Sequence, residues 1–133
     1  MMAQNELEHM INKLIDYVEK MGYHGHKNNA ERLYDGRYVK GEPYDYDVFL
    51  PSSHMCFDAK ETMSKNWQIR DKDIRQAQEL KRCKNAGCDA FFLIYFYQHM
   101  SLVRVDVDKV LDVLASGRKH IKYEECEAFE FPI

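Results

Sequence analysis

The stretch Tyr44–Glu61, with the sequence YDYDVFLPSSHMCFDAKE, decides the fold of this chain. Two runs rich in apolar residues, 44–50 and 54–60, flank the residues Pro51-Ser52-Ser53. Turn-forming residues between two short apolar runs are typical of a β-hairpin. The stretch therefore predicts two antiparallel strands joined by a tight turn.

Alternation along the second of these strands separates its side chains into two faces. Residues two apart on a strand share a face, so Asp58 lies beside Lys60, and Phe57 and Ala59 point the other way, toward the core. A carboxylate and a lysine are thereby held next to each other. This pairing marks one face of the hairpin as the place where chemistry is expected.

The first strand adds a second carboxylate, and the turn decides which one. A turn at Pro51-Ser52 pairs Asp45 with Asp58, whereas a turn at Ser52-Ser53 pairs Asp47 with Asp58. Two carboxylates held so close together repel each other unless a cation lies between them. Oxygen ligands select Mg²⁺ or Mn²⁺ over zinc. The alternative is an exposed hairpin face of solvated charges. Against it, residues 41–61 hold five acids and one base, and the acids flank strongly apolar residues.

The rest of the chain predicts helices and strands on both sides of the hairpin. Amphipathic spacing predicts helices over 5–21 and 71–86, and Asp108 is expected to cap a shorter helix that ends before Gly117. The predicted strands, beyond the hairpin, are a short one at 37–40, a central one at 90–97 covered on both faces, and one at 102–107. Residues 61–68 are expected to be irregular, and 121–133 to be an extended tail. This order predicts an α/β fold, a mixed central sheet flanked by helices.

Composition narrows the classes of protein further. With 133 residues and a net charge of −3, we expect a single domain over 1–133 and no uniformly basic surface. No apolar window is long enough for a membrane span, and the N-terminus has no secretory signal, so we expect a cytoplasmic protein. The four cysteines form no C-x-x-C pair, and His24 and His26 are the only close histidines. We therefore expect buried reduced thiols and no zinc site.

The hairpin resembles the PD-(D/E)XK nuclease superfamily, and in particular RecU, the bacterial Holliday junction resolvase. FDAKET at 57–62 is similar to the FEAKET segment of RecU, and Asp45-Tyr46 matches its Asp-Tyr at the same separation. Further similarities follow the same order along the chain: Leu7-Glu8 with Asn12, His26-Lys27, Gln76, Gly117–Ile121 and Tyr123-Glu124. The chain departs from the family at Asp58, usually Glu, at Tyr44, usually Thr, and at 28–44, where a projecting stalk is shortened. A compact, phage-type member fits these departures.

The resemblance implies a restriction-endonuclease-like core and a metal-dependent site. Asp58, Asp45 or Asp47, the Ala59 carbonyl and Glu8 would hold Mg²⁺ or Mn²⁺, although an acid such as Glu8 also stabilises a helix N-terminus by itself. Lys60 would orient the attacking water and neutralise developing charge, and Gln76 would help to position it. A homodimer is expected, because opposed cuts in a four-way junction match two-fold symmetry.

Contacts to DNA are expected from local groups of basic residues. Residues 65–84 hold seven basic against three acidic side chains. The candidates for phosphate contacts are Lys27, Arg37, Lys65, Arg70, Lys72, Arg75, Lys81, Arg118 and Lys119. The resulting hypothesis is an endonuclease that resolves branched DNA in recombination and repair, in a bacterial or phage-infected cell. The alternatives are another PD-(D/E)XK nuclease, of restriction or replication-repair type, or a catalytically inactive DNA-binding relative.

Overall fold

The computed structural model describes residues 6–28, 31–32, 38–39 and 45–130. Its centre is a six-stranded mixed sheet with the order β1-β4-β5-β7-β8-β10, in which β5 and β7 are parallel and the other neighbours are antiparallel. The strands of this sheet are β1 His24–Lys27, β4 Tyr46–Leu50, β5 Ser53–Thr62, β7 Asp89–Phe96, β8 Ser101–Asp106 and β10 Glu127–Ala128. The predicted α/β class with a mixed central sheet is confirmed.

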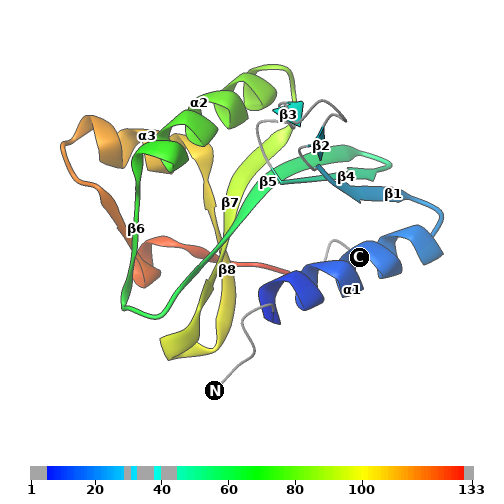
Figure 1. Ribbon diagram of the computed structural model, residues 1–133, viewed down its shortest axis with the longest axis horizontal. Coiled ribbons are helices and arrows are strands. Elements are labelled where there is room, and N and C mark those ends of the chain that lie inside the picture. The colour runs from blue at the N-terminus through cyan, green and yellow to red at the C-terminus, as the bar shows by residue number, and fades with distance from the viewer. Residues whose placement is uncertain (1–5, 29–30, 33–37, 40–44, 131–133) are drawn as a thin grey trace.

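Helices cover both faces of the sheet (Figure 1). The helices are α1 Glu6–Lys20, α2 Asp71–Asn85 and α3 Val107–Ala115. On one face, Leu7, Ile11, Leu14 and Val18 form the apolar stripe of α1 and pack against a core that includes Phe57. On the other face, α2 and α3 pack against a second core that includes Cys56, Phe92 and Ile94. Burial on both faces explains the nearly continuous apolar sequence of β7.

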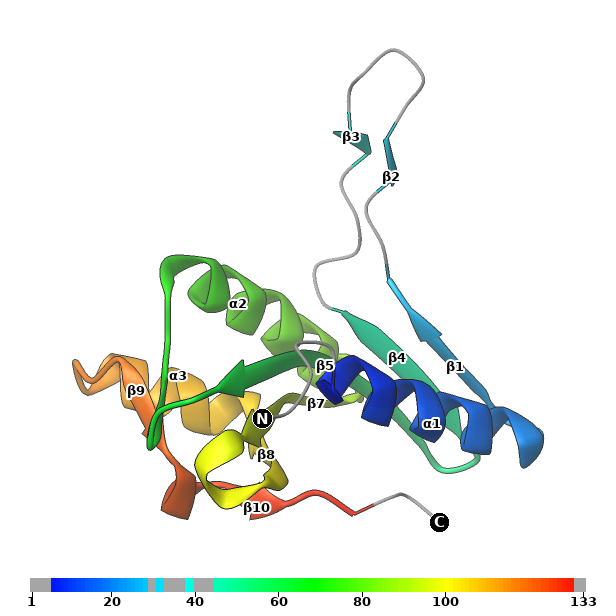
Figure 2. The same ribbon diagram turned by 60° about the horizontal axis from the view of Figure 1, so that its bottom comes forward.

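Two small antiparallel sheets complete the structure. One pairs β2 Glu31–Arg32 with β3 Tyr38–Val39, and Figure 2 shows this pair standing away from the rest of the molecule. The other pairs β6 Asn66–Gln68 with β9 His120–Lys122. Short 3₁₀ turns, Tyr97–His99 and Tyr123–Glu125, connect β7 to β8 and follow β9. The β6–β9 pair brings together two basic segments that are far apart in the sequence.

Most predicted elements are found within a few residues of their expected limits. The helix expected over 5–21 is α1, and the one expected over 71–86 is α2. The short strand expected at 37–40 is β3. The hairpin adopts the register in which Tyr46 pairs with Phe57, so Asp45 is the residue that continues toward Asp58. No helix in the described ranges is long and apolar enough to cross a membrane.

Two local predictions were wrong. The cap of α3 is Asp106, whose carboxylate accepts the Asp108 N–H at 2.9 Å, because β8 ends at Asp106, one residue before its expected limit, and α3 begins at Val107. Residues 61–68 are mostly not irregular, since β5 continues to Thr62 and β6 covers Asn66–Gln68. The alternative of a solvated hairpin face is excluded at Asp58, which is fully buried beneath α2, as Phe57 is on the opposite face.

Candidate active site

Lys60 occupies the centre of a buried polar cluster between β5 and the first turns of α2. Its ammonium Nζ lies 2.8 Å from Asp58 Oδ2 and 2.7 Å from Asp73 Oδ1, and it donates a hydrogen bond to Gln76 Oε1 at 2.8 Å. Only 13% of the Lys60 side chain is exposed. Burial alone would lower the pKa of this lysine, but the contacts with Asp58 and Asp73 outweigh burial and raise it. Lys60 is therefore held as a cation.

Helix α2 supplies two of the groups that surround this lysine. Asp73 and Gln76 are three residues apart and so lie on one face of the helix, which continues inward through the buried Ala77. Gln76 Nε2 also donates to Asp58 Oδ1 at 3.3 Å, and Asp73 Oδ2 accepts the Arg70 N–H at 2.9 Å at the start of the helix. The predicted place of Gln76 beside Asp58 and Lys60 agrees with this geometry.

Asp73 is a member of the cluster that the sequence analysis did not identify. It is only 4% exposed, although it belongs to a helix whose other early residues, such as Asp71 and Lys72, face solvent. From sequence alone, an acid in the first turn is explained by the helix dipole. The available signal was its spacing of three from Gln76, which places both on the side of α2 that carries Ala77 and Leu80.

Asp45 brings the second carboxylate to this cluster from the start of β4. Its Oδ2 accepts the Ala59 N–H at 3.1 Å. Burial, and next the negative charge of Asp45, raise the pKa of Asp58 to about 7, and the nearby Lys60 opposes this rise. Among the described residues, Asp58 Oδ2 has no hydrogen-bond partner of good geometry, although the Lys60 ammonium faces it. Two carboxylates held against each other in this way fit a divalent cation with oxygen ligands, Mg²⁺ or Mn²⁺.

A hollow of about 280 Å³ opens beside Asp45 on the α1 side of the sheet. Its lining includes Glu8, Asp45, Tyr46 and the predicted carbonyl ligand Ala59. Burial raises the pKa of Tyr46 to about 12, and Asp45, Glu8 and Asp58 contribute to the rise. Glu8 is half exposed and pairs with Lys27 at 3.0 Å. The structure thus places Glu8 at the mouth of the hollow, as an ion pair with a residue that was expected to contact DNA.

Asp47 lies in a different environment from Asp45. Its Oδ1 is 2.6 Å from His54 Nε2 and accepts a hydrogen bond from Cys56 Sγ at 3.6 Å, and its Oδ2 accepts from Asn28 Nδ2 at 3.1 Å. In the β4–β5 ladder it pairs with Cys56 rather than with Asp58. Of the two alternatives left by the sequence, the structure brings Asp45 to the Asp58–Lys60 cluster.

The basic residues expected to contact DNA fall into two groups. Five are exposed around the start of α2 and the end of the loop before β9: Lys65, Arg70, Lys72, Arg75 and Lys119. The Ile69 N–H donates to the Lys119 carbonyl at 2.9 Å, which joins these segments side by side. A hollow of about 470 Å³ lies there, lined by Lys60, Arg70 and Lys72 among others.

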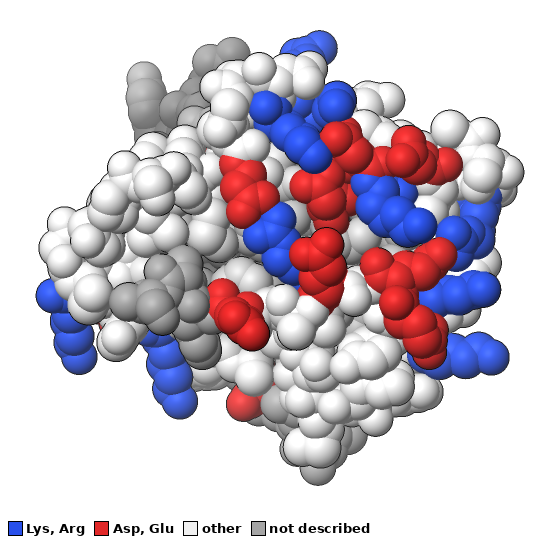
Figure 3. All heavy atoms as spheres, turned by 180° about the vertical axis from the view of Figure 1, so that it is seen from behind, with Lys and Arg blue, Asp and Glu red and all other residues white. Residues whose placement is uncertain are grey.

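The second group is already engaged with acidic side chains. Lys81 Nζ lies 2.7 Å from Asp108, and Arg118 forms a two-pronged contact with Glu125 at 2.7 and 2.9 Å. Arg37 lies outside the described residues. Figure 3 shows basic and acidic side chains interleaved on one face of the molecule, not a continuous basic surface. Any contact with DNA therefore depends on local groups such as the one at the start of α2.

Comparison with known proteins agrees with this architecture. The fold is similar to that of the Archaeoglobus fulgidus protein Hjc, described as a Holliday junction resolvase from an archaeal hyperthermophile, with a TM-score of 0.50, 12% identity and coverage of 77% of this chain and 74% of Hjc. No curated protein matches the chain significantly in sequence. The structural likeness shows a restriction-endonuclease-like fold.

Residues 20–133 match the model of the family RecU, Recombination protein U. The chain belongs to this family of Holliday junction resolvases, which are endonucleases that cleave four-way DNA junctions. The predicted family and activity are confirmed. The match covers Asp45, Asp58, Lys60 and Gln76, whereas Glu8 precedes it.

Proposed function

We propose that Asp45, Asp58 and Lys60 form the active centre of a Mg²⁺- or Mn²⁺-dependent resolvase that makes paired, symmetric incisions in four-way junctions. The observation that carries this proposal is the buried contact between Asp58 and Lys60, set against a second carboxylate that reaches the neighbouring Ala59 amide. Asp45, Asp58 and the Ala59 carbonyl are the ligands proposed for the cation. Glu8 is an additional ligand at the mouth of the hollow, where Lys27 now pairs with it.

The chemistry follows from the charges in this cluster. When bound, the cation supplies Lewis-acid polarisation of the scissile phosphate and acidifies a water molecule. Lys60 is kept protonated by Asp58 and Asp73, so its role is to orient the attacking water and to neutralise charge that develops on the phosphate. Gln76 bridges Asp58 and Lys60 and holds both in position. In-line attack leaves a 5′-phosphate and a 3′-hydroxyl.

The exposed basic residues at the start of α2 are the proposed phosphate-binding surface. Arg70 and Lys72 line a hollow that also reaches Lys60, so a DNA backbone lying there runs directly to the active centre. Lys119 extends the same surface through its backbone contact with Ile69. Contacts of this kind position the substrate without reading its sequence. Lys81 and Arg118, which are paired with acids, contribute less than these residues.

We further propose one nuclease domain over residues 1–133 that acts as a homodimer. Each chain carries one such centre, and two opposed incisions require two centres in fixed geometry. Because the substrate is branched DNA, we propose that the protein acts in the cytoplasm of a bacterial or phage-infected cell.

Cleavage and binding of a four-way junction by Asp58→Asn and Lys60→Ala test the assignment of the centre. Both variants are expected to lose cleavage, because the first removes a ligand charge and the second removes the cation that meets the transition state. Both are expected to bind the junction as the wild type does. Glu19→Gln, a change of an exposed acid of α1 outside both hollows, is the matched control and should cleave normally. Wild-type cleavage by either active-site variant contradicts the proposal.

A further inference from the structure

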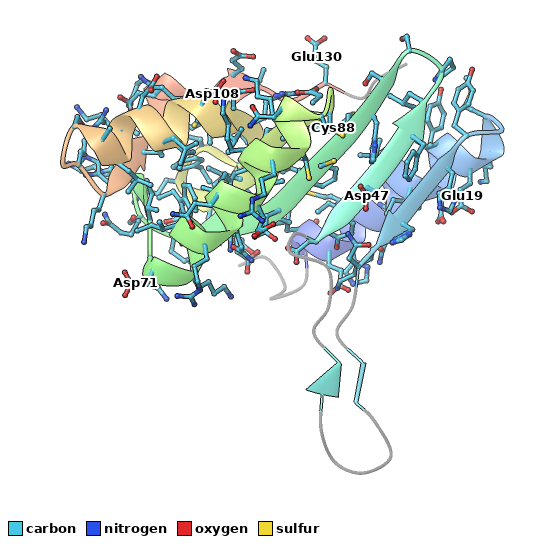
Figure 4. The ribbon with its side chains drawn as sticks, turned by 90° about the horizontal axis from the view of Figure 1, so that it is seen from above. Glu19, Asp47, Asp71, Cys88, Asp108 and Glu130 are labelled. Carbon is cyan, nitrogen blue, oxygen red and sulfur yellow. The ribbon has the colours of Figure 1, made fainter. Side chains whose placement is uncertain are left out.

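Four side chains with metal-binding chemistry meet next to the active centre, on the α2 side of the sheet. They are Asp47 from β4, His54 and Cys56 from β5, and Cys88 from the residue before β7. One ligand atom each from His54, Cys56 and Cys88 lies within 4.8 Å of the others. Figure 4 shows Asp47 and Cys88 on neighbouring parts of the sheet, with Asp71 at the far end of α2.

Strand register brings these residues together although they are dispersed in the sequence. Asp47 pairs with Cys56 across the antiparallel β4–β5 ladder. In the parallel β5–β7 ladder Met55 pairs with Asp89, so His54 lies opposite Cys88. His54 and Cys56 are two apart and share a face of β5. The four residues therefore lie close together on three adjacent strands, with Asp47 and Cys88 at opposite ends of the group.

The end of α2 fixes the position of Cys88. The helix closes with the Cys88 N–H donating to the Cys83 carbonyl at 3.0 Å, and Gly87 adopts a φ of +105° between them. That left-handed conformation is readily adopted by glycine and is disfavoured for other residues. The thiol of Cys88 is delivered to within 3.5 Å of His54 Nδ1.

The distances fit an ion with two sulfur ligands and one nitrogen ligand. Cys88 Sγ lies 3.5 Å from His54 Nδ1, and the ligand atoms of His54, Cys56 and Cys88 all lie within 4.8 Å of one another. Bond lengths of about 2.3 Å to sulfur and about 2.0 Å to nitrogen give tetrahedral edges of about 3.5 Å. The other ring nitrogen, Nε2, lies 2.6 Å from Asp47 Oδ1, so Asp47 orients the imidazole from outside the ligand set.

We propose that His54, Cys56 and Cys88 bind one Zn²⁺ ion that is separate from the catalytic cation, with Asp47 hydrogen-bonded to the imidazole. Two thiolates and an imidazole select zinc, whereas the oxygen ligands of Asp45 and Asp58 select Mg²⁺ or Mn²⁺. Asn28 donates to the second carboxylate oxygen of Asp47 and orients it, as outer contacts do in metal sites. The ion has a structural role, because it ties β5, which carries Asp58 and Lys60, to the residue before β7.

Metal content and cobalt spectroscopy of the full chain, purified under reducing conditions, test this proposal. We expect one Zn²⁺ per chain after dialysis, and Co²⁺ in its place should give the thiolate charge-transfer and intense visible bands of a tetrahedral site. Cys88→Ser should weaken binding by about a hundredfold or more. Cys126→Ser changes a thiol outside the group and is the matched control. Asp58→Asn should keep the cobalt spectrum, which separates this site from the catalytic one.

Several results would overturn the proposal. One is a wild-type chain that takes up no zinc and gives only the weak bands of octahedral cobalt, which would leave the group as a hydrogen-bonded cluster. Another is loss of the spectrum in Cys126→Ser together with its retention in Cys88→Ser. A disulfide between Cys56 and Cys88 in the reduced preparation, detected by mass spectrometry, would also exclude the site. The measurement on wild-type protein does not depend on the folding of any variant.

Discussion

Replacing Asp58 by asparagine is expected to stabilise the cation-free protein while it destroys the active centre. Burial, and next Asp45, raise the pKa of Asp58 from 3.8 to about 7, so the ionised form is disfavoured in the folded state. That rise corresponds to about 4 kcal/mol of free energy of unfolding at a pH well above 7. Asparagine has the size of the protonated acid but carries an additional N–H donor. If burying that donor costs up to half of this value, the expected gain in the free energy of unfolding is about 2–4 kcal/mol.

The sign of the pH dependence follows from the raised pKa. The folded state binds a proton at Asp58 that the unfolded state has already lost, so the wild type loses stability as the pH rises from about 4 to about 7. The variant lacks this group. Its advantage in the free energy of unfolding should therefore grow by about 1–3 kcal/mol between pH 5 and pH 8.

Urea unfolding and thermal unfolding of both proteins in metal-free buffer at several pH values measure this difference. At pH 8 the melting temperature of the variant should exceed that of the wild type by at least about 6 °C. Added Mg²⁺ should stabilise the wild type and not the variant. Asp71→Asn, an exposed change in the first turn of α2, is the control and should show no such pH-dependent gain. A variant that is less stable than the wild type at pH 8, or a difference that is constant from pH 5 to pH 8, would refute the reasoning.

Four further outcomes are expected. Asp45→Asn should weaken Mg²⁺ binding measured by calorimetry, whereas Asp47→Asn should leave it within about twofold; the reverse order would make Asp47 the ligand. Asp73→Asn should slow junction cleavage by roughly tenfold, since Lys60 loses a carboxylate 2.7 Å away, and an unchanged rate would remove Asp73 from the centre. Arg70→Ala should weaken binding to junctions of any sequence equally and reduce the salt dependence by about one unit of slope; a sequence-dependent loss would indicate base contacts. Ultracentrifugation at micromolar concentration should show a dimer, and a chain that stays monomeric on junction DNA would contradict the proposed paired incisions.

The elements of the fold could be predicted from sequence because their signals are local. The apolar stripe of α1, the turn at Pro51-Ser52 and the continuous apolar run of β7 each depend on neighbouring residues. The hairpin sequence also predicted the two possible partners of Asp58, Asp45 and Asp47. Choosing between them required the register, which the loop length leaves open by one residue and which determines every cross-strand pair.

The parts of the site that the sequence did not reveal depend on contacts between residues that are far apart in the sequence. Asp73 and Lys60 meet only because α2 crosses over β5. The burial of Asp58 depends on the same helix, so the residues of the hairpin argued against a solvated face but could not show what covers it. The pairing of Lys81 with Asp108, 27 residues later, likewise engages a candidate DNA contact that composition alone suggested.

The group of Asp47, His54, Cys56 and Cys88 shows the same limit most clearly. Zinc-binding motifs are usually recognised by close pairs of cysteines, and here the two cysteines come from different strands. Only the pairing of β5 with β7 places Cys88 opposite His54. The expectation of isolated buried thiols followed from spacing along the chain, which does not report distances across a sheet.

The most direct test of the central claim maps the incisions at nucleotide resolution. A synthetic four-way junction and a linear duplex built from the same arm sequences are incubated with wild-type protein and Mg²⁺, and the labelled strands are resolved individually. We predict paired nicks at symmetric positions in two opposed strands of the junction, with 5′-phosphate ends, little cutting of the duplex, and no cutting of either by Asp58→Asn. Equal cutting of junction and duplex, unpaired nicks, or cutting that survives the loss of Asp58 would contradict the account.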